Sequence, residues 1–217
     1  MAAPYELIYY TGVPGRGEHV RLILEEAGAP YQDTQFLSFD EARKNVTNWL
    51  AGGGHGNPPY FAPPLFKHGD LVISQTPNIL LYLGPKLGLA GSQENDLYRV
   101  NALASTALDL LCNEVHDTHH PIAVMMPYED QKKESKRRSE YWVHNRLPSV
   151  LAYWQKVLEN DERGPGPWLL GDTFTYADLV LFQVCGLPPQ KNHESQVGPI
   201  HEIPSLASLL AQADHSK

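Results

Sequence analysis

The sequence has little of several features that would assign it at once to a protein class. Only two of its 217 residues are cysteine, so no disulfide framework is available to hold the fold together. No apolar run approaches the roughly 18 residues that a membrane-spanning helix needs. Basic residues are the minority, with 17 Lys and Arg against 25 Asp and Glu. An acidic chain without a basic stripe argues against nucleic acid and anionic membrane surfaces as partners.

The two cysteines and the N-terminus favour a reducing, cytoplasmic location. Cys112 and Cys185 lie far apart in apolar helical patterns, which predicts buried thiols that are not linked. The first residues have no basic stretch followed by an apolar run, so no signal peptide is expected. Hydrophobic residues make up 42% of the chain and charged residues 19%, as in a globular protein of one large or two small domains.

The first 84 residues alternate between strand and helix patterns. Residues 5–10 are rich in β-formers, and Gly and Pro at residues 11–15 indicate a turn after them. Apolar residues then recur at the spacing of a helix face, and Gly69 and Asp70 indicate a hairpin turn between two later strands. The expected order is β-α-β-α-β-β-α, over residues 5–10, 20–27, 31–36, 39–50, 65–66, 71–73 and 76–84.

The start of the last of these helices is the most informative stretch. Thr76 is a good N-cap, and Pro77 sits at the first helical position, where its missing N–H costs nothing. The turn therefore presents a hydroxyl and backbone N–H groups at a helix start, which suits a carboxylate. The same residues also fit an ordinary capped helix.

The rest of the chain has helical periodicity only. Residues 85–93 are polar with Gly and Pro and are predicted to form a linker. Beyond them, an apolar stripe covers residues 97–111, and a second helical stretch over residues 138–159 is expected to break or kink at Pro148. Thr175 and Asp178 form the capping signature of a further helix.

Three segments, in this order, resemble the cytosolic glutathione transferases of the tyrosine-type classes, sigma, mu and pi among them. They are residues 9–28, residues 69–84 and residues 171–178. The resemblance implies an α/β thioredoxin-like glutathione-binding domain (1–84), a linker (85–93) and an all-α domain with the electrophile site (94–217), in a homodimer.

The resemblance implies conjugation of the glutathione thiolate to electrophiles, in detoxification or secondary metabolism. Two alternatives stay open: a glutathione-dependent isomerase or peroxidase on the same site, and a non-catalytic binding or scaffold protein with this fold. Half-ionising a thiol of pKa near 8.5 at pH 7 needs about 2 kcal/mol, and one hydrogen bond to a charged acceptor supplies about 1.5–3 kcal/mol. A single phenol O–H is therefore sufficient.

Tyr9 is the candidate for that phenol, and Tyr10 is the alternative. The spacing from Tyr5 and the aromatic residue that follows favour Tyr9, whereas counting back from Gly15 and Arg16 favours Tyr10. Neighbouring strand residues point to opposite faces, so only one of the two can serve.

By the resemblance, Gln75 and Thr76 hold the γ-glutamyl carboxylate, and Trp49 donates to the glycyl carboxylate. His55 either binds that carboxylate, weakly because imidazole is mostly neutral at pH 7, or is a plain loop residue. Asp109 matches the aspartate that reaches the partner subunit's glutathione. Apart from the proline pair described next, Arg16 is the remaining residue that the resemblance assigns to glutathione binding.

The pair Pro63–Pro64 departs from the family pattern. Spacing assigns the family's cis-proline to Pro64, whose preceding residue pairs with the cysteinyl backbone. Pro63 has no N–H to donate. Either one of the two backbone bonds is missing, or Pro63 is the cis residue and Ala62 makes the contacts.

The histidines near residue 118 have two interpretations. His116, His119 and His120 can share one helix face, but no further ligand occurs at a recognisable spacing, so no metal is expected. His119 instead falls where the family places an aromatic residue of the electrophile site. With Tyr10 and His116 it would form a pocket that favours polar or acidic co-substrates.

Overall fold

The protein is described by a computed structural model over residues 4–52 and 59–185. The chain divides into two compact units, Met1–Asn101 and Ala102–Lys217. The division falls within the helix α4 (Asp96–Ala107), so the predicted linker, residues 85–93, lies in the first unit. No helix among the described residues is long and apolar enough to cross a membrane.

The first unit contains a four-stranded sheet in the order β2-β1-β3-β4. β1 (Tyr5–Ile8) pairs in parallel with β2 (Tyr31–Asp33) and antiparallel with β3 (Leu65–His68), which pairs antiparallel with β4 (Leu71–Ser74). A parallel pair needs a crossover connection, and the helix α1 (Glu18–Glu26) provides it, after the 3₁₀ turn η1 (Gly15–Gly17). The predicted order of strands and helices is confirmed.

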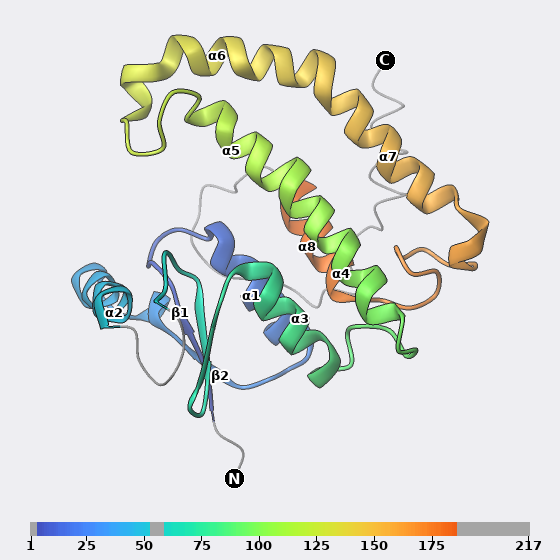
Figure 1. Ribbon diagram of the computed structural model, residues 1–217, viewed down its shortest axis with the longest axis horizontal. Helices are drawn as coiled ribbons and strands as arrows, with labels where there is room; N and C mark the ends of the chain where they lie inside the picture. The colour runs from blue at the N-terminus through green and yellow to red at the C-terminus, as the bar shows by residue number, and fades with distance from the viewer. Residues whose placement is uncertain (1–3, 53–58, 186–217) are drawn as a thin grey trace. The chain divides into compact units, whose positions relative to one another are not determined.

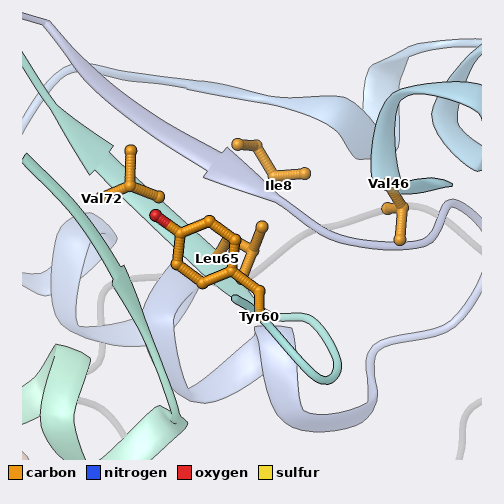
Figure 2. Packing of buried hydrophobic residues seen from close by; sticks show 5 residues of the cluster. All are labelled: Ile8, Val46, Tyr60, Leu65 and Val72. Atoms are coloured by element: carbon orange, nitrogen blue, oxygen red, sulfur yellow. The ribbon is translucent and has the colours of Figure 1, made fainter. Parts of the chain in front are cut away.

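Helices cover both faces of this sheet (Figure 1). α1 lies beside α3 (Thr76–Lys86), and α2 (Phe39–Gly52) contacts β1. Between α2 and the strands, one apolar cluster is formed by Ile8, Val46, Tyr60, Leu65 and Val72 (Figure 2). Fully burying one aliphatic side chain contributes about 1.5–3 kcal/mol, so this cluster is a main reason why α2 stays on the sheet.

β2 is shorter than predicted, and this difference matters for the site. The strand ends at Asp33, and residues 34–36 form the 3₁₀ turn η2 (Thr34–Phe36) instead of continuing the ladder. The Asp33 carboxylate accepts a hydrogen bond from the Gln35 N–H at 2.8 Å. This local bond competes with strand pairing and turns the chain.

The second unit is helical in its described part, as predicted. The π-helical turn η3 (Leu108–Asn113) joins α4 to α5 (Glu114–His119), and a second π-helical turn, η5 (Trp142–Arg146), joins α6 to α7. α8 contacts η3. The remaining elements are η4 (Tyr128–Gln131), α6 (Lys132–Tyr141), α7 (Leu147–Glu159), η6 (Asp161–Arg163) and α8 (Tyr176–Cys185).

Three sequence predictions in this unit have clear outcomes. The break or kink expected at Pro148 takes the form of the π-helical turn η5, after which α7 begins at Leu147 with the proline in its first turn. The cap of α8 is also confirmed, since the Asp178 carboxylate accepts hydrogen bonds from the Thr175 N–H and hydroxyl. The prediction of two buried thiols is wrong: Cys112 is half-buried and Cys185, at the end of α8, is exposed.

Candidate functional site

Tyr9 directly follows β1 and is buried, with 9% of its surface exposed. Its phenolic oxygen accepts a hydrogen bond from the Arg16 N–H at 3.0 Å. A Cβ on Gly15 or Gly17 would overlap the Tyr9 side chain, so η1 can approach the ring only because these residues lack a side chain. A phenol that accepts one hydrogen bond still has its own O–H to donate.

Tyr10 lies in a different environment. It is 39% exposed, and its ring centroid is 5.6 Å from that of Tyr9 with the planes at 58°. β1 ends at Ile8, earlier than the predicted residue 10, so both tyrosines lie beyond the strand and the expected alternation of faces does not apply to them. Of the two, Tyr9 is the one whose hydroxyl is fixed by the backbone of η1.

The backbone of Tyr9 is held by the side chain of Thr34. The Thr34 hydroxyl accepts from the Tyr9 N–H at 2.8 Å and donates to the Tyr9 carbonyl at 2.6 Å. No sequence pattern indicated this contact, because Thr34 lies 25 positions away in a stretch that was predicted to be strand.

A buried charge network stands beside Tyr9. The Arg21 guanidinium donates to Asp33 at 2.6 Å and to Glu18 at 2.9 Å, and its central carbon is 5.8 Å from the Tyr9 ring centroid. Burial opposes the charge of Arg21, but the hydrogen bond and the charge of Asp33, with a further contribution from Glu18, outweigh this and raise the pKa of Arg21. The network joins α1 to the end of β2.

The start of α3 differs from the prediction by one residue. The N-cap is Gln75, and Thr76 is already helical, because the Gln75 carbonyl accepts the hydrogen bond from the Ile79 N–H at 2.9 Å. Gln75 has a φ of 72°, in the region that favours glycine. Such a conformation costs about 1–3 kcal/mol and clusters at ligand-binding sites.

Thr76 links this helix start to the turn that holds Tyr9. Its hydroxyl donates to the Arg16 carbonyl at 3.4 Å, while the Arg16 N–H donates to Tyr9. The predicted thiol-activating residue and the predicted carboxylate site are therefore connected through one residue, Arg16, within the first unit.

The backbone shows which proline of the pair is the cis residue. The Pro63–Pro64 peptide bond is cis, so Pro64 is the cis residue and Pro63 precedes it. Pro64 is buried at the start of β3 and Pro63 is half-buried. Because Pro63 has no N–H, its carbonyl is the one backbone hydrogen-bonding group that this residue offers.

The other predicted glutathione contacts from this unit are less defined. Trp49, on α2, is half-buried against the apolar cluster, and its ring lies 6.4 Å from that of Tyr60, centroid to centroid, with the planes at 64°. His55 lies outside the described residues.

Several known proteins are similar to this chain. Residues 116–214 match the family model described as the glutathione S-transferase C-terminal domain. The chain is 26% identical to glutathione S-transferase P of Bos taurus, over 98% of this chain and 94% of that relative. It is 25% identical to S-crystallin SL11 of Nototodarus sloanii, over 98% of this chain and 92% of the relative.

A solved structure is also similar to this chain. The pi-class glutathione S-transferase of Onchocerca volvulus superposes with a TM-score of 0.61 at 25% identity, over 83% of this chain and 75% of that one. The chain is therefore similar, over most of its length, to cytosolic glutathione S-transferases. The predicted fold class, a thioredoxin-like unit followed by a helical unit, is confirmed.

The resemblance to glutathione transferases also predicts site residues in the second unit. Asp109 is exposed on η3 and accepts a hydrogen bond from the Asn113 side chain at 3.1 Å. An exposed carboxylate is accessible to a second subunit, but it also fits an ordinary helix surface.

The histidines of α5 form ring pairs. His116 lies 5.1 Å from His120, and His119 lies 5.0 Å from Tyr128, centroid to centroid. Gln131 is fully buried behind them and contacts His120 Nδ1 at 3.2 Å. Across residues 4–52 and 59–185, no three His, Cys, Asp or Glu side chains come together as a metal site.

His19 is a buried histidine that the sequence did not single out. On α1, it is 2% exposed, and its Nδ1 has no hydrogen-bond partner among the described residues. Burial, with a smaller contribution from the charge of Arg16, lowers its pKa from 6.5 to about 4. The imidazole is therefore neutral at pH 7.

Proposed function

We propose that this protein is a glutathione transferase in which the Tyr9 O–H stabilises the thiolate of bound glutathione for attack on an electrophile. The observation that carries the proposal is the position of the Tyr9 oxygen. It accepts the Arg16 N–H and so has its own proton to donate. The donated hydrogen bond supplies about 1.5–3 kcal/mol, enough to ionise much of the thiol at neutral pH.

The same proposal places the glutathione peptide along the first unit. Gln75 and Thr76 bind the γ-glutamyl carboxylate at the start of α3, where first-turn N–H groups have no partner within the helix. The positive φ of Gln75 supports this, because strain of this kind persists where the surrounding structure requires it. Trp49 and His55 bind the glycyl carboxylate, Arg16 contributes charge, and the Pro63 carbonyl accepts the cysteinyl N–H beside Pro64.

The electrophile would lie against Tyr10, His116 and His119. Aromatic and imidazole rings offer stacking and hydrogen bonds, which suit polar or acidic co-substrates. Glutathione is the co-substrate, and no metal takes part in the proposed step. A role in detoxification in the cytoplasm is the physiological expectation.

A homodimer is part of the proposal, with Asp109 reaching the glutathione of the partner subunit. The first unit exposes large apolar side chains that suit a protein interface. Phe61 is 93% exposed and Phe39 is 65% exposed. Size determination of the purified protein tests this directly.

The test of the function is glutathione conjugation to a generic aryl halide. Tyr9→Phe should lower kcat by about 10- to 150-fold, the equivalent of one charged hydrogen bond, while glutathione binding persists. Tyr10→Phe is the matched control and should retain most of the rate.

Other outcomes would assign either a different catalytic residue or a different function to this protein. Equal rates for Tyr9→Phe and wild type would transfer the role to Tyr10. A wild type that binds glutathione without conjugating aryl halides would instead support an isomerase, a peroxidase or a non-catalytic protein. The similarity to an S-crystallin makes the last of these worth assaying.

A further inference from the structure

We infer that Thr34 is a positioning residue for Tyr9: its one hydroxyl holds both backbone groups of the tyrosine and thereby sets the direction in which the phenol donates. The inference rests on the proposed function, because it concerns the same thiol-activating hydroxyl.

Tyr9 lies where the sheet no longer holds the chain. The last register pairs of β1 are Leu7 with Asp33 on one side and Ile8 with Leu65 on the other. β2 then ends and the chain turns into η2. The Thr34 hydroxyl replaces the missing ladder, with bonds of 2.8 Å from the Tyr9 N–H and 2.6 Å to the Tyr9 carbonyl.

Water is a poor substitute for this hydroxyl. Thr34 and Tyr9 are each only 9% exposed. Removing the hydroxyl would leave one buried N–H and one buried carbonyl without partners, and such groups move until they find one. The Tyr9 backbone would therefore leave its present position.

Hydrogen bonds of the neighbouring residues hold Thr34 in place. Its neighbour Asp33 accepts a hydrogen bond from the Gln35 N–H at 2.8 Å and one from Arg21 at 2.6 Å. These bonds hold both sides of Thr34, so the hydroxyl is presented in one position.

The phenol has little freedom once its backbone is fixed. Gly15 and Gly17 press against the ring, and the Arg16 N–H binds its oxygen. A displaced backbone would then turn the O–H away from the sulfur. Hydrogen bonds weaken steeply as the donor angle falls below about 120°, so a small displacement removes much of the thiolate stabilisation.

The decisive measurement is the pKa of the thiol of bound glutathione, followed by the ultraviolet absorbance of the thiolate. Thr34→Val keeps the shape and removes the hydroxyl. It should raise the thiol pKa by about one unit and, for a thiol that is half-ionised in wild type, lower kcat at neutral pH by about fivefold. KM for glutathione should change by less than about twofold, because its carboxylate sites lie elsewhere. Thr34→Ser keeps both bonds and should match wild type.

Thr11→Val is the control for lost stability. The Thr11 hydroxyl donates to the Gln35 carbonyl at 2.7 Å, so it joins the same two segments without touching Tyr9. This variant should lower the unfolding midpoint and leave the thiol pKa unchanged. If Thr34→Val does not fold, Thr34→Cys carries the test, since its weaker, longer bonds should give a smaller rise in thiol pKa.

A Thr34→Val protein that loses stability but keeps the wild-type thiol pKa and kcat would overturn the inference, because Thr34 would then be structural only. Failure of the proposed function has a different signature. In that case wild type itself shows no thiolate absorbance with glutathione and no turnover.

Discussion

Acid should destabilise this protein through His19, independently of its carboxylates. The imidazole is almost fully buried on α1, and its Nδ1 has no partner among the described residues. Its pKa falls from 6.5 to about 4 on folding. The unfolded chain therefore binds the proton more readily than the folded one does.

The sign and size follow from proton linkage. Above pH 6.5 both states hold a neutral imidazole, and the stability is fully present. As pH falls below 6.5, the unfolded state is protonated first, and stability is lost until the folded pKa of about 4 is passed. At about 1.4 kcal/mol per pKa unit the total loss is about 3 kcal/mol, of which about 2 kcal/mol falls between about pH 7 and about pH 5.

The assay is urea unfolding of wild type and His19→Phe over this pH range. The phenylalanine ring keeps a planar side chain of similar size and cannot take up a proton. The free energy of unfolding of the variant should fall less with acid, by about 2 kcal/mol at about pH 5. Replacing the exposed His144 by Gln is the control for the loss of one histidine from a surface position.

Parallel pH profiles of wild type and His19→Phe would refute the reasoning. They would mean that the folded protein can protonate His19 at the ordinary pKa, which requires access to water or to a carboxylate at this position.

Three further substitutions test other parts of the structure. Gln75→Gly should relieve the positive φ and raise the free energy of unfolding by about 1 kcal/mol, yet weaken glutathione binding measured by calorimetry, because the side chain is lost. Gly17→Ala should place a methyl group against the Tyr9 ring and cost about 1–3 kcal/mol, with reduced conjugation; unchanged stability and rate would show that the ring moves freely. Gln131→Leu should leave the Ile122 N–H and the carbonyls of Ala123 and Met126 without their side-chain partner. Each group that stays unpaired costs about 1–3 kcal/mol, and hydrogen exchange at the Ile122 amide should become faster. An exchange rate at Ile122 equal to that of wild type would contradict this prediction.

Short-range patterns in the sequence were sufficient to predict the local elements and the resemblance to glutathione transferases. Periodicity fixes which side of a helix is apolar, and turn residues such as Gly69 and Asp70 or caps such as Thr175 act over a few positions. These signals act over a few residues, so they can be recognised in the sequence without the folded structure. They predicted the order of strands and helices, the irregularity next to Pro148 and the similarity to glutathione transferases.

The distant residues that support the candidate site become visible only in the folded chain. Thr34 holds Tyr9 across 25 positions, and Arg21 pairs with Asp33 across the β1–β2 crossover. No periodicity encodes such contacts, because they depend on where β2 stops and η2 turns. The same holds for the pKa of His19: a histidine in a helix pattern titrates normally unless packing removes water from it, and packing is a property of the folded chain.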